Sequence, residues 1–72
     1  MATITLTDDY ITLGQVLKEV GAIDSGGQAK WYLADHPVTL NGELEARRGK
    51  KLRAGDAVTL ADGTTVTIAA RQ

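Results

Sequence analysis

The densest cluster of chemically active side chains in this sequence is the stretch RRGKKLR, residues 47–53, which holds five of the eight basic residues of the 72-residue chain. The five are Arg47, Arg48, Lys50, Lys51 and Arg53. Clustered guanidinium and ammonium groups are the means by which proteins neutralise the phosphates of a nucleic-acid backbone. An isolated run of charges can equally be a solvated loop that aids solubility. The stretch therefore predicts phosphate contact, with a solubilising loop as the alternative.

A second candidate is the stretch SGGQAKW, residues 25–31, in which two glycines precede a lysine. A helix that starts here leaves backbone N–H groups unpaired, and such groups bind anions. Gly26 and Gly27 lack the Cβ atoms that would hold a phosphate away, Gln28 can cap or donate, and Lys30 lies one turn further on. The alternative is that one glycine takes a turn with positive φ and binds nothing. The spacing, and the lack of a serine or threonine after the lysine, exclude a Walker phosphate loop.

Trp31, the only tryptophan, admits two interpretations. On a helix that turns about 100° per residue, Trp31 falls on the same side as Lys30. An exposed tryptophan beside a lysine suits base stacking or contact with a protein partner. Folded down onto a sheet, it would instead be part of the core, which a chain without phenylalanine could need. We expect Tyr10 and Tyr32 to be core residues.

Side chains for catalysis or metal binding are scarce. His36 is the only histidine, and although Asp35 stands beside it, the pair has no nucleophile or metal partner nearby in the sequence. The chain has no cysteine, which excludes disulfides and thiolate metal sites. We therefore expect no catalytic residue, no metal and no cofactor, and we interpret His36 as a helix-end residue favoured by the helix dipole.

The glycine stretch opens the second of two predicted helices. In the first, residues 12–20, apolar residues recur at the spacing of one buried helical face. Thr12 and Gln15 form a capping-box pattern at its start, and Gly21 suits a left-handed turn at its end. A second Ser-x-x-Gln pattern opens the next helix at Ser25, and that helix must end before the chain's single proline. Two short helices joined by a few residues predict a helix-turn-helix pair.

The basic stretch lies between two predicted β-hairpins. Asn41-Gly42 and Asp62-Gly63, each flanked by alternating apolar residues, are the strongest short hairpin signals. Residues 2–6 alternate and are rich in β-branched side chains, which predicts a short first strand. The fold class expected is α+β, with the two helices packed on one face of a small antiparallel sheet that the first strand joins.

The chain resembles a known family over roughly residues 11–60. A helix, a short turn, a helix that opens with serine and a basic residue, a Val-x-Val-Asn-Gly run and a late Gly-Asp are the pattern of the RNA-binding domain of ribosomal small-subunit protein four, the alpha-L fold. Ser25, Ala29-Lys30, residues 38–42 and Gly55-Asp56 fall in register with it. Several weak motifs in the right order are more specific than any one of them. The chain is more similar still to the small stand-alone members, of the YaaA and YbcJ type, which share the Gly-Gln-Ala-Lys element.

This resemblance implies a single RNA-binding domain, residues 1–72, that binds structured RNA of the ribosomal or transfer RNA class without catalysis. The sequence departs from the family pattern at the start of the second helix. It has Gly26, Gly27 and Gln28 where arginine is common in the family, and Lys30 in place of an arginine. We expect a cytoplasmic monomer whose partner is RNA, in a ribosome or ribonucleoprotein. No apolar stretch approaches the roughly 20 residues of a membrane span, so we expect no membrane contact. The alternative function is a protein-interaction adaptor that uses Trp31.

The expected RNA-binding residues come from the opening of the second helix and from the basic stretch. They are Gly26, Gly27, Gln28, Lys30, Trp31, Arg47, Arg48, Lys50, Lys51 and Arg53.

Overall fold

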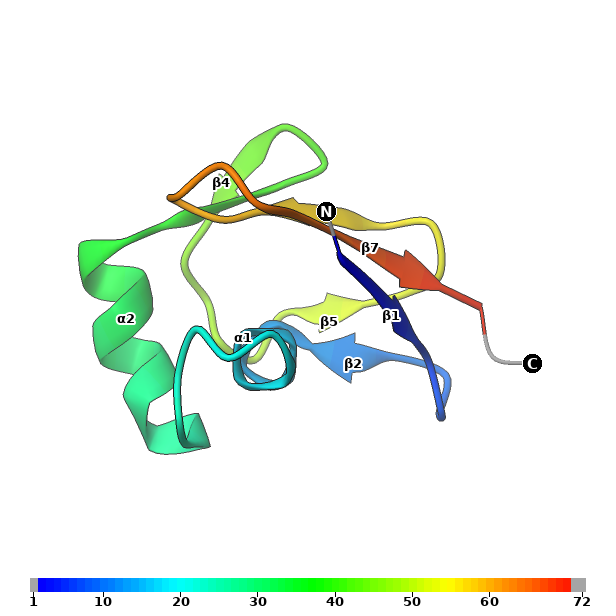
Figure 1. Cartoon of the computed structure of the whole chain (residues 1–72), viewed down its shortest axis with the longest axis horizontal. Helices are drawn as coiled ribbons and strands as arrows, with labels where there is room; N and C mark the ends of the chain where they lie inside the picture. Colours follow the sequence, from blue (N-terminus) through cyan, green and yellow to red (C-terminus); the bar gives the residue numbers. More distant parts are fainter. Residues whose placement is uncertain (1, 71–72) are drawn as a thin grey trace.

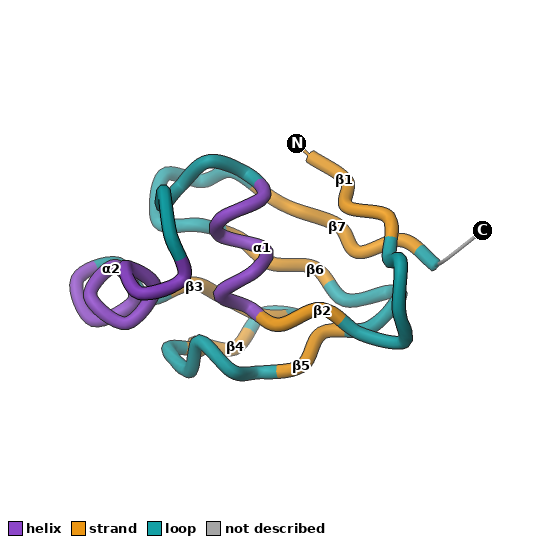
Figure 2. The backbone as a smooth tube through the Cα atoms, turned by 90° about the horizontal axis from the view of Figure 1, so that it is seen from below, coloured by secondary structure: helices purple, strands orange, loops and turns teal. Residues whose placement is uncertain are grey.

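The computed structural model describes residues 2–70. It contains a five-stranded sheet with α1 lying across one of its faces and α2 at the side of that layer, as Figures 1 and 2 show from two directions. A separate two-stranded ribbon of β2 and β5 lies beside α1. The elements are β1 Ala2–Thr5, β2 Ile11–Thr12, α1 Leu13–Glu19, a 3₁₀ turn Gly26–Gln28, α2 Ala29–Asp35, β3 Val38–Leu40, β4 Glu43–Glu45, β5 Lys51–Leu52, β6 Ala57–Thr59 and β7 Thr65–Ala69.

The sheet has the strand order β1-β7-β6-β3-β4. The β3–β4 and β6–β7 pairs are antiparallel, as expected from the two hairpin turns, and the β3–β6 pair is antiparallel as well. The β1–β7 pair is parallel, with Ala2 opposite Val66 and Thr5 opposite Ala69, so the expectation of a purely antiparallel sheet is wrong here. The physical reason is that β1 is followed by a long crossover through both helices, and a parallel pair requires such a connection.

The first helix begins and ends where the sequence predicts. The backbone N–H of Thr12 donates to Gln15 Oε1 at 2.9 Å, and the N–H of Gln15 donates to Thr12 Oγ1 at 3.3 Å, which completes the capping box. Gly21 follows the helix with φ of +79°, the left-handed turn expected there. Leu13, Val16 and Leu17 are fully buried and form the face that packs on the sheet.

The second helix starts differently from the expectation, because Gly26 and Gly27 lie in a 3₁₀ turn rather than in the α-helix. The predicted Gln28 contact is present: Gln28 Oε1 accepts the N–H of Ser25 at 3.2 Å and that of Asp24 at 2.6 Å. Neither glycine has positive φ, so the interpretation that one of them is needed for a positive-φ conformation is wrong. α2 then ends at Asp35, before the proline, as predicted.

The core consists of aliphatic side chains from the sheet and both helices. Trp31 is 70% exposed, which excludes its interpretation as a core residue. Tyr10 is 40% exposed, so its expected core position is wrong, whereas Tyr32 is half-buried and packs against the core. The small aliphatic core needs no tryptophan because α1 and α2 supply leucines and alanine at the buried positions.

Two backbone hydrogen bonds attach residues 47–53, which we call the basic loop, to the start of α1. The N–H of Leu13 donates to the carbonyl of Lys50 at 2.9 Å, and the N–H of Gly14 donates to the carbonyl of Arg48 at 2.8 Å. A Cβ atom at Gly14 would lie 3.4 Å from that Arg48 oxygen and 3.6 Å from the Cβ of Ala29. The space at Gly14, between the loop, α1 and α2, therefore accommodates one methyl group at ordinary contact distances.

We predict that Gly14→Val destabilises the protein by about 1–3 kcal/mol, because its methyl groups would overlap the backbone of the basic loop. Gly14→Ala is the matched control, since its single methyl makes contacts of ordinary length. Thermal unfolding of the two variants checks this prediction. A Gly14→Val protein that melts as high as Gly14→Ala would contradict the close approach.

Candidate nucleic-acid interface

The basic loop is held at both ends and in the middle. It follows β4, passes the start of α1 and leads into β5, which pairs with β2 (Figure 1). In that ribbon Thr12 lies opposite Lys51 and Ile11 lies opposite Leu52, whose side chain is fully buried. Together with the two hydrogen bonds to α1, these contacts fix the backbone from which the cations project.

The family-like motifs are also joined here, at the end of the loop. Asn41, which has φ of +51°, donates from Nδ2 to Asp56 Oδ1 at 3.0 Å and accepts the N–H of Ala57 at 2.9 Å. Asp56 Oδ2 accepts the N–H of Arg53 at 2.8 Å. That backbone hydrogen bond, then the Asn41 contact and the nearby charges of Lys50 and Arg53, lower the pKa of Asp56. These motif residues therefore position the loop.

Arg48 borders a surface hollow of about 310 Å³, which we call the Arg48 hollow. Gly26 lies on the same hollow, so the structure brings together one residue from each of the two predicted segments. Further polar residues around it are Thr12, at the N-cap of α1, and Gln15 and Lys18, from the exposed side of α1. The guanidinium of Arg48, the amide of Gln15 and the ammonium of Lys18 thus belong to residues around one hollow. Gly26, on the same hollow, has no side chain. Sequence reasoning missed Gln15 and Lys18.

The other four cations surround a neighbouring hollow of about 450 Å³, which we call the loop hollow. Its lining is Arg47, Gly49, Lys50, Lys51 and Arg53, with no carboxylate. Among residues 2–70, only Arg47 of the loop cations forms a salt bridge shorter than 4 Å. Its guanidinium binds both oxygens of Glu45, at 3.0 and 3.1 Å. This contact lowers the pKa of Glu45 to about 2 and offsets much of the positive charge of Arg47.

Tyr10 is an aromatic side chain at the edge of this basic region. The Nζ of Lys51 lies 4.9 Å from the centre of its ring. A half-exposed ring beside a lysine is suited to stack on a nucleobase. The sequence gives no signal for this position, because Tyr10 and Lys51 meet only through the pairing of β2 with β5.

The two glycines of the second segment have no packing role of their own. No atom lies within 4 Å of an ideal Cβ at Gly26, and only Ser25 Oγ, at 4.0 Å, approaches one at Gly27. Gly26 faces the Arg48 hollow, whereas Gly27 does not line it. Alanine would therefore fit at both positions. The lack of a side chain at the two glycines leaves the backbone there accessible at the protein surface.

Trp31 and Gln28 lie around a third hollow, of about 520 Å³, which we call the Trp31 hollow. It shares no lining residue with the other two and carries the carboxylates of Asp24 and Asp35. Lys30 lines none of these three hollows, and its Nζ lies 5.7 Å from the centre of the Trp31 ring. The predicted RNA-binding residues of the second helix therefore divide between a basic and an acidic environment.

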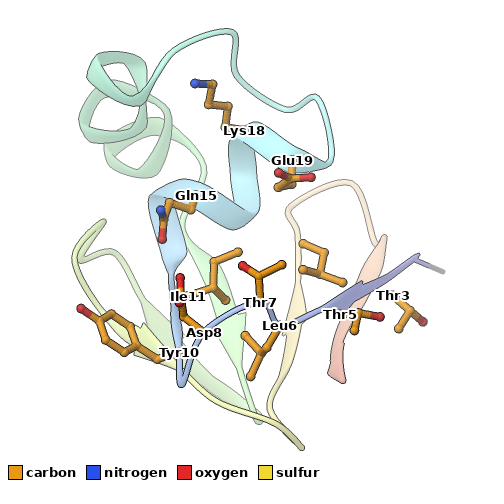
Figure 3. Close-up of a pocket in the computed structure, with 11 residues that line it drawn as sticks. Thr3, Thr5, Leu6, Thr7, Asp8, Tyr10, Ile11, Gln15, Lys18 and Glu19 are labelled. Carbon is orange, nitrogen blue, oxygen red and sulfur yellow. The ribbon is translucent and has the colours of Figure 1, made fainter. Parts of the chain in front are cut away.

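A larger hollow of about 680 Å³ lies between β1 and α1 (Figure 3). Its polar lining is mixed: several threonines, one lysine and the carboxylates of Asp8 and Glu19. No histidine borders it, and residues 2–70 contain no cluster of three or more metal-ligating His, Cys, Asp or Glu side chains. The described helices are also too short to cross a membrane.

Comparison with known proteins gives matches along most of the chain. Residues 4–69 match the family model described as "S4 domain". The "Probable ribosome maturation protein RlbA" of Bacillus subtilis (strain 168) is 49% identical over 57 residues, which are 79% of this chain and 80% of the relative. The "Putative RNA-binding protein YbcJ" of Escherichia coli (strain K12) is 37% identical over 70 residues, which are 96% of this chain and 100% of the relative. The resemblance to ribosomal small-subunit protein four is confirmed, and the chain belongs to the S4 domain family.

Proposed function

We propose that this protein binds structured RNA without catalysis, and that the Arg48 hollow and the loop hollow contact its phosphates. The observation that carries the proposal is the fixed backbone of the basic loop, which presents its cations around two adjoining hollows. The names of the two relatives, one for RNA binding and one for ribosome maturation, support it. They also favour a cytoplasmic role on ribosomal or other folded RNA.

A fixed basic surface favours folded RNA over flexible strands. The loop loses little conformational freedom on binding, because hydrogen bonds and strand pairing already hold it. Its groups are mostly charged donors, which recognise the shape of the backbone and carry few contacts to base edges. Tyr10 adds one stacking surface for an unpaired base. The finer arrangement, α1 and α2 acting as a helix-turn-helix unit whose second helix opens towards a phosphate, belongs to this proposal.

We expect affinity in the micromolar range, with a salt dependence that corresponds to roughly three to five neutralised phosphates. The reason is that four loop cations and Lys18 have no carboxylate partner within 4 Å among the described residues. Titration of a labelled RNA hairpin at several salt concentrations measures the slope, and an unstructured strand of the same length is the control. Affinity that stays constant from low to physiological salt would overturn phosphate contact.

We predict that Arg48→Gln weakens RNA binding more than Arg47→Gln does. Arg48 borders its hollow without an ion pair among the described residues, whereas Arg47 shares its charge with Glu45. Loss of one phosphate contact should reduce the salt slope by about one. Melting temperatures should stay close to that of the parent for both variants, because exposed charges contribute about 1 kcal/mol or less. Equal losses of affinity would remove the distinction between the two arginines.

We predict that Gly26→Ala lowers RNA affinity while stability holds or rises, by about 0.4–1 kcal/mol at most. The new methyl has open space in the protein but stands in the Arg48 hollow. Gly27→Ala is the matched control, with the same change in backbone entropy outside that hollow. Paired melting and titration experiments test this. A Gly26→Ala protein that binds RNA like Gly27→Ala would show that the glycine is not part of the site.

A further inference from the structure

The Trp31 hollow shares no lining residue with the two hollows that we propose contact RNA. Trp31 is 70% exposed, and α2 buries instead Ala29 and Leu33. Tyr32 and His36, whose ring centres are 5.3 Å apart, form a further aromatic part of the hollow. A large exposed aromatic surface is costly in water, and tryptophan is among the residues that contribute most at protein interfaces.

The charge around this hollow is opposite to that of the basic loop. Asp24 approaches from the connection between the helices and Asp35 from the last turn of α2, which contains no basic residue. Neither carboxylate has an ion-pair partner within 4 Å among residues 2–70. Two uncompensated carboxylates repel phosphate and attract cations. Lys30, with Nζ 5.7 Å from the Trp31 ring, shows that a cation can occupy the space beside this indole.

We infer that the Trp31 hollow binds an arginine-containing basic segment of a protein partner. The guanidinium stacks on the Trp31 ring and donates to the carboxylates of Asp24 and Asp35, which lie on the same hollow. Arginine suits the site better than lysine, because its planar group can stack on the ring and bind a carboxylate with two N–H groups at the same time. The protein then holds RNA on one surface and a basic protein segment on another. This inference does not depend on the RNA proposal.

Trp31 is the only tryptophan of the chain, so its fluorescence reports directly on this hollow. The probe is an end-blocked octapeptide of alternating arginine and glycine, titrated into the intact protein at low salt. We expect a saturable change in emission, a several-fold weaker response to the lysine version and none to the glutamate version. Absence of a saturable response to the arginine peptide would overturn the inference.

The double variant Asp24→Asn, Asp35→Asn should weaken peptide binding roughly tenfold, since it removes both charge partners and changes little in shape. The matched control is Glu43→Gln, Asp62→Asn, which removes the same charge from exposed positions that do not line the hollow. The control should bind the peptide like the parent. Equal losses in both double variants would show that binding depends on net charge alone and would overturn the site.

Two further measurements distinguish a basic protein segment from the other possible occupants of the Trp31 hollow, which are RNA and a second copy of this chain. RNA affinity of the Asp24→Asn, Asp35→Asn variant should stay within about twofold of the parent, because the carboxylates lie outside the RNA surface. If RNA changes the Trp31 emission and this variant alters RNA affinity strongly, the hollow is part of the RNA site. If sedimentation shows self-association that the variant abolishes, the hollow holds the basic loop of a second copy. Either result overturns a separate protein partner, and neither would overturn RNA binding itself.

Discussion

The arrangement of this protein depends on the attachment of the basic loop to the first turn of α1. The N–H groups of Leu13 and Gly14 would otherwise be available to an anion, but the carbonyls of Lys50 and Arg48 occupy them. These two N–H groups are therefore not available to an anion. The attachment also places cations beside the positive end of a helix dipole, where they are unfavourable. Backbone hydrogen bonds, strand pairing and the buried Leu52 offset that repulsion, and a bound phosphate would relieve it further.

The motifs that identify the family act on the position of this loop more than on contact with a ligand. Asn41, in the β3–β4 hairpin turn, donates to Asp56, in the turn between β5 and β6, and Asp56 also accepts the backbone N–H of Arg53. The sheet is joined in this way to the end of the basic loop. Gly14 acts similarly from the other side, because its N–H donates to the carbonyl of Arg48. A protein of this size can thus present a dense set of cations with very little supporting structure.

Local features of the fold could be predicted from the sequence, and long-range pairings could not. The capping boxes around Thr12 and Gln28, and the turn at Gly21, depend on residues within a few positions of each other. The parallel β1–β7 pair depends on residues more than sixty positions apart. The same limit applies to the site. The cations of the basic loop can be recognised as a run in the sequence. Only packing brings Lys18 to the same hollow as Arg48, and the Tyr10 ring next to Lys51. The sequence leaves Trp31 open as either an exposed or a core residue, because a helical wheel does not show which other elements pack against that face of the helix.

The strand order has a consequence for synthesis. β7, the last strand, lies between β1, the first, and β6, so it provides the only partner of β1 in the sheet. While the chain is being made, β1 has no partner in the sheet until residues 65–69 have emerged from the ribosome. Pairing of β1 is therefore a late step, because it joins residues far apart in the sequence. A chain that lacked β7 would leave β1 without a partner and β6 as an edge strand.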